Sequence, residues 1–127
     1  MKIVEKPWGR EVWVAHTDRY ALKIIEIRQG NRSSLQLHRV KHEHLYVDRG
    51  TFRIEHEDAE GTMQVSTLGP GEVIEIRPGT RHRAEAVTDV RLIEVSTPEL
   101  DDVVRLADDY GRSSGGQGRP GGASEGG

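Results

Sequence analysis

Short stretches in which apolar and polar residues alternate recur along most of this chain, and they restrict its fold more than any other feature. Alternation with a period of two places successive side chains on opposite faces of a β-strand. Turn-forming residues separate many of the stretches, as in Gly69-Pro70-Gly71 and Pro78-Gly79. Short strands with such breaks are typical of antiparallel sandwiches and barrels. We expect strands at residues 11–16, 20–28, 33–38, 43–48, 51–56, 63–68, 72–76, 82–87 and 90–96.

The pattern changes near the end of the chain, where residues 97–111 read TPELDDVVRLADDYG. Leu100, Val103, Val104 and Ala107 recur there at helical spacing. This spacing predicts a short C-terminal helix packed outside the barrel.

From Gly111 onward the sequence is rich in glycine and contains no large apolar residue. Such a segment cannot bury enough surface to offset the entropy lost on ordering. We therefore expect a folded domain at residues 1–110 and a disordered tail at residues 111–127. The predicted fold class is all-β, with one short helix.

Composition excludes several classes of function. The chain contains no cysteine, so any metal must be held by nitrogen and oxygen ligands. The net charge of -3 and the pI of about 6.1 do not fit a nucleic-acid-binding protein. No apolar run approaches the roughly 20 residues that cross a membrane, and the N-terminal MKIVEKPWG lacks the apolar stretch of a signal peptide. We expect a cytoplasmic protein with no nucleic-acid or membrane partner.

Residues 34–44, SLQLHRVKHEH, hold three of the six histidines of the chain. In a strand, Gln36 and His38 share one face, and Leu35 and Leu37 share the other. In one interpretation the leucines face the core and His38 is exposed. In the other, Gln36 and His38 face the interior of a small barrel, which can hold a ligand, and the leucines pack on another sheet or a second subunit.

The next expected strand favours the second interpretation. Glu43 shares a face with Leu45 and Val47, which belong in the interior, so Glu43 is expected there as well. A buried carboxylate is costly unless a metal or another cation compensates it. His44 then points outward, and His42 lies in a turn and could face either way.

A third stretch, RPGTRHRAEAV, places His82 after a tight turn and on the same face as Ala84 and Ala86. His16 and His56 are interpreted as ordinary strand histidines. Two imidazoles, a carboxylate and an amide would suit a divalent metal ion. If the hairpins adjoin, four side chains converge: Gln36, His38, Glu43 and His82.

These motifs resemble the cupin superfamily, and most of all the mannose-6-phosphate isomerase domain of bifunctional guanylyltransferase/isomerase enzymes. The resemblance implies a cupin jelly-roll barrel and a metal-dependent enzyme that interconverts mannose 6-phosphate and fructose 6-phosphate. The chain shows no glycine-rich nucleotide-binding segment, so only the isomerase half is expected. The matching segments are EKPWGREVWV at 5–14, SLQLHRVKHEH at 34–44, RPGTRHR at 77–83 and LIEVSTPELDDVVRLADDYGR at 92–112.

The resemblance assigns metal ligands to His38, Glu43 and His82. A further ligand histidine of the family falls on Val40, and Gln36 or His42 could replace it. One divalent ion is implied, with Zn²⁺ favoured and Mn²⁺, Fe²⁺, Ni²⁺ and Co²⁺ also compatible.

The resemblance also suggests residues that act on the substrate. Lys41 stands where the family has an arginine, and lysine offers phosphate only a point charge. Lys41 and Arg83 are expected to bind phosphate or sugar hydroxyls. Glu94 is the candidate catalytic base, although Leu92 and Ile93 leave the direction of its side chain undecided.

Three functions are compatible with these observations. The leading hypothesis is the sugar-phosphate isomerase, acting as a homodimer that packs through outward-facing Leu35 and Leu37. The substitutions at Val40 and Lys41 motivate the alternative, a non-catalytic or differently specialised cupin that binds a sugar or another small molecule. A metal-dependent oxygenase is the third, supported only by the ligand set.

Overall fold

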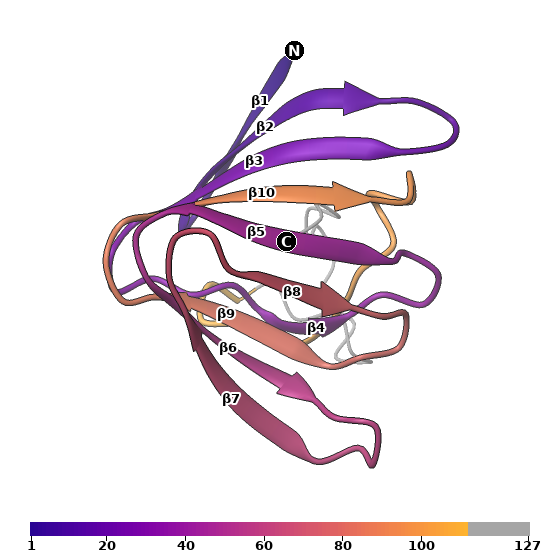
Figure 1. The fold of residues 1–127 in the computed structure, drawn as a ribbon. Coiled ribbons are helices and arrows are strands. Elements are labelled where there is room, and N and C mark those ends of the chain that lie inside the picture. Colours follow the sequence, from indigo (N-terminus) through magenta and orange to yellow (C-terminus); the bar gives the residue numbers. More distant parts are fainter. Residues whose placement is uncertain (112–127) are drawn as a thin grey trace.

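The computed structural model describes residues 1–111, which form eleven β-strands and, within those residues, no helix (Figure 1). All nine strands expected from the alternation are present. The two strands that the alternation missed lie at the ends of the described chain. The strands are β1 (Lys2–Lys6), β2 (Gly9–His16), β3 (Ala21–Ile27), β4 (Leu35–Leu37), β5 (Glu43–Arg49), β6 (Phe52–Glu57), β7 (Met63–Leu68), β8 (Val73–Ile76), β9 (His82–Ala86), β10 (Val90–Ser96) and β11 (Val104–Ala107).

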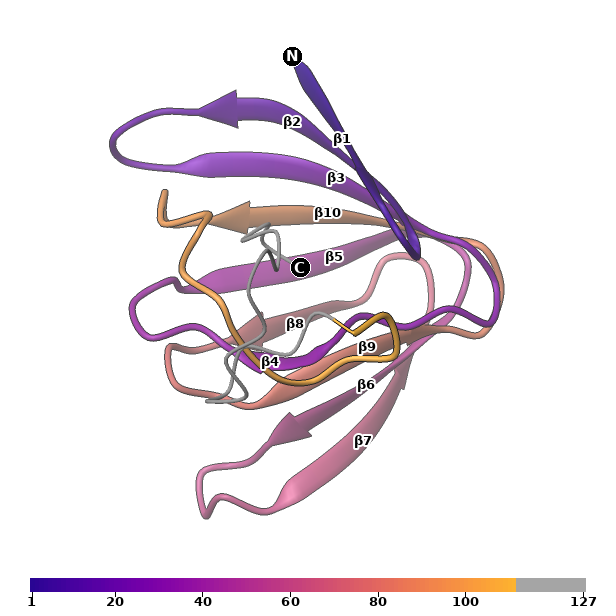
Figure 2. The ribbon, with the colours of Figure 1, turned by 180° about the vertical axis from the view of Figure 1, so that it is seen from behind.

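The strands form two sheets that face each other around a common interior (Figure 2). One sheet has the order β1-β2-β3-β10-β5-β8 and the other the order β11-β4-β9-β6-β7, and every pairing is antiparallel. Trp8 and Phe52 are fully buried and are the largest members of the core. The core cluster comprises Trp8, Ile25, Ile27, Leu45, Val47, Phe52, Ile54, Leu68, Ile76, Ala84, Ala86, Val90 and Leu92.

The predicted C-terminal helix is wrong. Residues 97–111 contain turns and β11, which pairs with β4 in a register that sets Val104 opposite Leu37 and Arg105 opposite Gln36. The edge of β4 offers backbone groups that need partners, and the β-branched Val103-Val104 pair favours strand over helix. The predicted disordered tail lies outside the described residues from position 112 onward.

The turn at Pro78-Gly79 connects β8 to β9 and also contacts the end of β4. Gly79 has a positive φ of 80°, which glycine adopts at little cost. Its N–H donates to the carbonyl of His38 at 2.6 Å. The β8–β9 turn and the β4–β5 loop therefore lie side by side, at the right of the barrel in Figure 1.

Candidate metal centre

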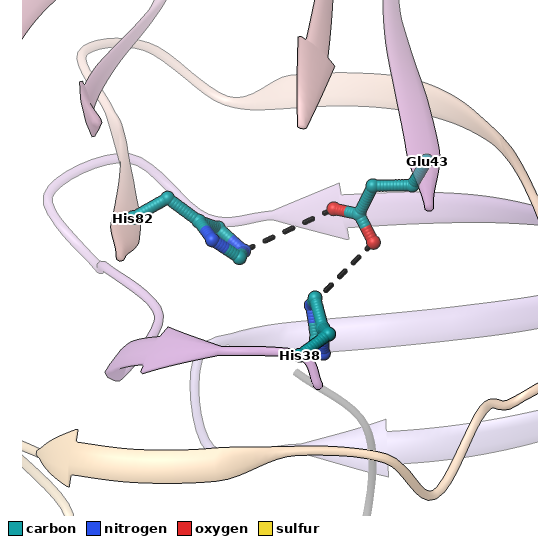
Figure 3. A group of neighbouring side chains, drawn as sticks. All are labelled: His38, Glu43 and His82. Carbon is teal, nitrogen blue, oxygen red and sulfur yellow. Dashed lines mark ion pairs between the residues drawn. The ribbon is translucent and has the colours of Figure 1, made fainter. Parts of the chain in front are cut away.

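Three predicted ligands from three chain segments meet inside the barrel (Figure 3). His38 directly follows β4, and Glu43 and His82 are the first residues of β5 and β9. All three side chains are buried, and their ligand atoms lie within 4.8 Å of one another. The Glu43 carboxylate lies between the rings, with its Oε2 3.5 Å from His38 Nε2 and its Oε1 3.9 Å from His82 Nε2.

Hydrogen bonds on the far side of each ring set the orientation of the two imidazoles. His38 Nδ1 lies 2.6 Å from the carbonyl oxygen of Asp102, and His82 Nδ1 lies 2.9 Å from that of Thr80. Because a carbonyl only accepts, each Nδ1 must carry the proton. Each Nε2 then presents a lone pair toward Glu43, which is the arrangement that metal-binding histidines usually have.

The protonation state of His38 is the one that a metal ligand requires. Within the part of the chain that the structure describes, its Nε2 is buried and has no hydrogen-bond partner. Burial lowers the pKa of His38 to about 4, against the opposing effect of Glu43. The ring is therefore neutral near pH 7, as a metal ligand must be.

Glu43 and Glu94 flank a buried ammonium group. Lys41 Nζ lies 2.9 Å from Glu43 Oε2 and 3.1 Å from Glu94 Oε2, and all three residues are at most 3% exposed. Burial opposes ionisation of Glu43, but the charge and the hydrogen bond of Lys41 act against it, and the pKa of Glu43 lies below its ordinary value. Burial and the charge of Glu43 instead raise the pKa of Glu94.

The charged cluster continues toward β2 and β3. Lys23 Nζ lies 3.1 Å from Glu11 Oε1 and 3.7 Å from Glu94 Oε2, and both Lys23 and Glu11 are buried. Together with Glu43 and Lys41, the cluster contains three carboxyl groups and two ammonium groups. A bound cation would compensate the excess of negative charge.

Gln36 lies beside the predicted ligands. It is buried, its Cα is paired with that of His82, and its Oε1 accepts a hydrogen bond from Ser34 Oγ at 2.6 Å. Gln36, Glu43, His82 and Glu94 all line one small cavity of about 20 Å³. That volume admits roughly one water-sized sphere, so the cavity suits an ion rather than a hexose.

The structure separates one predicted site residue, Arg83, from this cavity. Arg83 lies next to His82 but alternates to the outer face, where its Nε donates to the carbonyl of Ser33 at 2.9 Å. Its guanidinium also lies 3.3 Å from Asp109 Oδ1. A role for Arg83 in substrate binding stays a prediction that its position does not favour.

Of the two residues considered as replacements at Val40, only Gln36 reaches the cavity. His42 Nε2 lies 2.7 Å from Glu75 Oε2, and its ring stacks on His44 outside the barrel. The side chain of Val40 is 62% exposed. The outward direction expected for His44 is confirmed.

Two residues near the ligands were missed from the sequence. His56 on β6 is opposite His82 in the sheet, and its Nε2 lies 2.9 Å from Ser66 Oγ. Its alternation with the buried Phe52 and Ile54 could have placed it on the inner face. No sequence signal pointed to Asp102, because its contacts cross from the C-terminal segment to the β4–β5 loop.

A larger hollow of about 390 Å³ lies elsewhere, at the end of the barrel where β2 and β10 begin. Four arginines line it, and they are partly matched by Glu5, Glu26 and Asp89. Its charged groups include Arg10, Arg28, Arg49 and Arg91. Its lining includes no histidine, so it does not offer the imidazole ligands found at the smaller cavity.

Comparison with known sequences identifies relatives of this chain. The family model described as mannose-6-phosphate isomerase C-terminal matches residues 1–108. A mannose-1-phosphate guanylyltransferase of Escherichia coli K12 is 38% identical over 114 residues, which are 86% of this chain and 23% of that protein. The alginate biosynthesis protein AlgA of Pseudomonas aeruginosa is 31% identical over 114 residues, covering 87% of this chain and 23% of that protein. The chain thus spans about a quarter of the length of these relatives.

Solved structures share the fold. KdgF from a Halomonas species superposes with a TM-score of 0.68 at 25% identity, over 80% of this chain and 90% of that chain. An RmlC-like cupin from Shewanella frigidimarina superposes with a TM-score of 0.65 at 21% identity, over 76% of this chain and 83% of that chain.

Among the described residues, no helix has the length and apolar character needed to span a membrane.

Proposed function

This chain belongs to the family of the mannose-6-phosphate isomerase C-terminal domain and has the cupin fold, and we propose that it is a metal-dependent sugar-phosphate isomerase. The proposed reaction interconverts mannose 6-phosphate and fructose 6-phosphate. The observation that carries the proposal is the convergence of two imidazole lone pairs on a buried carboxylate, beside a second buried carboxyl group. Those groups are His38, His82, Glu43 and Glu94.

The first three of these residues would hold the metal, with Gln36 as the fourth ligand. Two nitrogen ligands, a carboxylate and an amide oxygen suit Zn²⁺ first, and Mn²⁺, Fe²⁺, Ni²⁺ or Co²⁺ as well. When bound, a divalent ion supplies Lewis-acid stabilisation of negative charge on a substrate oxygen.

Glu94 would move the proton between C1 and C2 of the sugar. It lines the same cavity as Glu43 and His82, and burial brings its pKa up toward the working pH of a general base. The burial of Glu94, on the same side of β10 as Leu92, supports this role.

Lys41 has a different environment from the one expected of a phosphate-binding lysine. Its ammonium group lies between two buried carboxylates, and 1% of the residue is exposed. We propose that Lys41 chiefly holds Glu43 and Glu94 in place. A contact with a substrate oxygen would require one of these ion pairs to open.

The small cavity and the exposed Val40 favour one alternative, a cupin that binds a metal and a sugar or other small ligand without turnover. A hexose phosphate needs more space than about 20 Å³, so isomerisation requires side chains around the cavity to move. A protein that binds mannose 6-phosphate without forming fructose 6-phosphate would support this alternative.

We further propose that the protein forms a homodimer through the outer face of the six-stranded sheet. Leu35 and Leu37, expected at the interface, are half-buried in the other sheet. An apolar row instead crosses all six strands of the larger sheet, and Ile3, Tyr46 and Val73 in it are 44–57% exposed. Light scattering of the wild type and of Tyr46→Glu would test this, with a monomeric wild type as the contradicting result. The row is Ile3, Val12, Ile24, Ile93, Tyr46 and Val73.

The isomerase proposal is tested by following fructose 6-phosphate formed from mannose 6-phosphate. The protein is stripped with a chelator and then reloaded with Zn²⁺, Mn²⁺, Ni²⁺, Co²⁺ or Fe²⁺. We expect activity to disappear on stripping and to return with at least one metal. Activity that persists in fully stripped protein, or that never appears with any metal, would contradict the proposal.

A further inference from the structure

His38 lies just beyond the end of β4, so the strand pairing does not include it. β4 contains three residues, which pair with β11 at three positions and with β9 at one, Gln36 opposite His82. The ring of His38 is fixed instead by the segment between β10 and β11. There the carbonyl oxygen of Asp102 accepts the Nδ1 proton at 2.6 Å.

The carboxylate of the same residue binds the loop that joins β4 to β5. Asp102 Oδ1 accepts from the backbone N–H of Arg39 at 3.1 Å, and Oδ2 accepts from those of Val40 at 2.7 Å and Lys41 at 2.9 Å. Hydrogen bonds to an ionised carboxylate are stronger than those between neutral groups. Burial opposes ionisation of Asp102, but the three amides outweigh it and lower its pKa.

We propose that Asp102 is a positioning residue of the metal centre. Its carbonyl keeps His38 in the tautomer whose Nε2 lone pair points at Glu43, and its carboxylate fixes the loop through which the chain passes from His38 to Glu43. This inference rests on the proposed metal site. It links the C-terminal segment to the ligand geometry, so β11 and the turn before it serve the site as well as the sheet.

The mechanism requires both groups of Asp102 to act together. The carbonyl of Asp102 orients the ring of His38. The position of that ring also depends on the backbone of residues 39–41, which the carboxylate holds. In Asp102→Asn, an NH2 group that cannot accept replaces one of the two oxygens that the three loop amides share, so the loop and the Nδ1 contact loosen together. Partners that orient a metal-bound histidine typically contribute about tenfold to a hundredfold in metal affinity.

The neighbouring residue offers a matched control. Asp101 is exposed, carries the same charge and precedes Asp102 directly. The amides of residues 39–41 are bound to Asp102. Asp102→Asn and Asp101→Asn thus remove one negative charge each from adjacent positions and preserve the side-chain size.

The first readout needs no metal. Imidazole ¹⁵N shifts of metal-free protein report which ring nitrogen carries the proton. We expect the Nδ1-protonated pattern for His38 in the wild type and in Asp101→Asn, and a pattern of exchanging tautomers in Asp102→Asn. The second readout is the affinity for Co²⁺, measured by competition with a chelator. We expect it to fall about tenfold or more in Asp102→Asn and to change less than twofold in Asp101→Asn.

The two readouts separate the inference from the proposed function. The inference is overturned if Asp102→Asn keeps the His38 pattern of the wild type, or if its Co²⁺ affinity stays within twofold. If the pattern changes but the wild type binds no metal, the positioning of His38 stands and the proposed metal-dependent function fails. If Asp102→Asn does not fold, Asp102→Glu displaces the carboxylate with its charge retained, and the same criteria apply.

Discussion

His38 directly follows β4 and His82 begins the neighbouring strand β9, and each donates its Nδ1 proton to a backbone carbonyl so that both Nε2 atoms face Glu43. This relationship supports our proposal that the cluster is a ligand set rather than a group of core histidines. A structural histidine commonly uses both ring nitrogens in hydrogen bonds. Here the backbone binds one nitrogen of each ring and leaves the other for a cation.

Replacing Gln36 should identify the fourth ligand. Gln36→Leu keeps the approximate volume but removes the amide oxygen beside His82, so we expect the affinity for Zn²⁺ to fall about tenfold or more. The matched control is His42→Ala, because His42 lies outside the barrel with Glu75. Calorimetric titration of the two variants checks this. Equal affinities in the wild type and Gln36→Leu would exclude Gln36 as a ligand.

Replacing Glu94 should separate chemistry from metal binding. Glu94→Gln removes the proposed base but leaves His38, Glu43 and His82 in place. We expect the metal content to be retained and the isomerase kcat to fall by about 10²-fold or more, the usual contribution of general base catalysis. Steady-state kinetics of the metal-loaded variant test this. A kcat within a few-fold of the wild-type value would remove Glu94 from the mechanism.

Replacing Lys41 should destabilise the metal-free protein. Lys41→Met leaves Glu43 and Glu94 buried without the ammonium group between them. Breaking a buried ion pair by removing one partner costs about 3–5 kcal/mol. The exposed Arg39 provides the control, since Arg39→Met should change the free energy of unfolding by less than about 0.5 kcal/mol. Urea denaturation measures the free energy of unfolding of both variants. Equal values for the wild type and Lys41→Met would contradict a structural role for Lys41.

The stability of the metal-free protein should depend on pH through His38. Its pKa in the folded state is about 4, below the ordinary 6.5, because burial disfavours the charged ring. Between these values the unfolded chain binds more protons, so the free energy of unfolding falls as the pH decreases from about 6.5 to about 4. The loss due to His38 is of the order of 3 kcal/mol.

Urea denaturation at several pH values tests this dependence. His38→Gln should flatten the decline, and the exposed control His44→Gln should leave it unchanged. A decline as steep in His38→Gln as in the wild type would assign the pH dependence to other groups.

Alternation predicted much of the fold because the barrel has one buried face on each strand. The order Glu43, Leu45, Val47 on β5 placed a carboxylate in the interior, and the structure confirms that all three are buried. The same rule places Gln36 and His38 on one face of β4, but it does not say whether that face points into the barrel. The direction of that face becomes clear only from the order of the strands in the sheet.

The remaining features depend on contacts that local patterns do not encode. The spacing of apolar residues between Leu100 and Ala107 fits a helix. The segment forms a strand instead, because it pairs with the edge of β4. In the sequence, Asp102 resembles any acidic turn residue. Only the folded chain shows that the loop at 39–41 lies against it. Such long-range backbone partners are set by tertiary packing, which overrides local propensity.

The most direct test of the metal centre is elemental analysis by mass spectrometry of the purified wild type, His82→Ala and the control His44→Ala. We predict about one transition metal ion per chain in the wild type and in His44→Ala, and none in His82→Ala. The absence of metal from all three proteins, even after incubation with Zn²⁺, Mn²⁺, Ni²⁺ and Fe²⁺, would contradict the account.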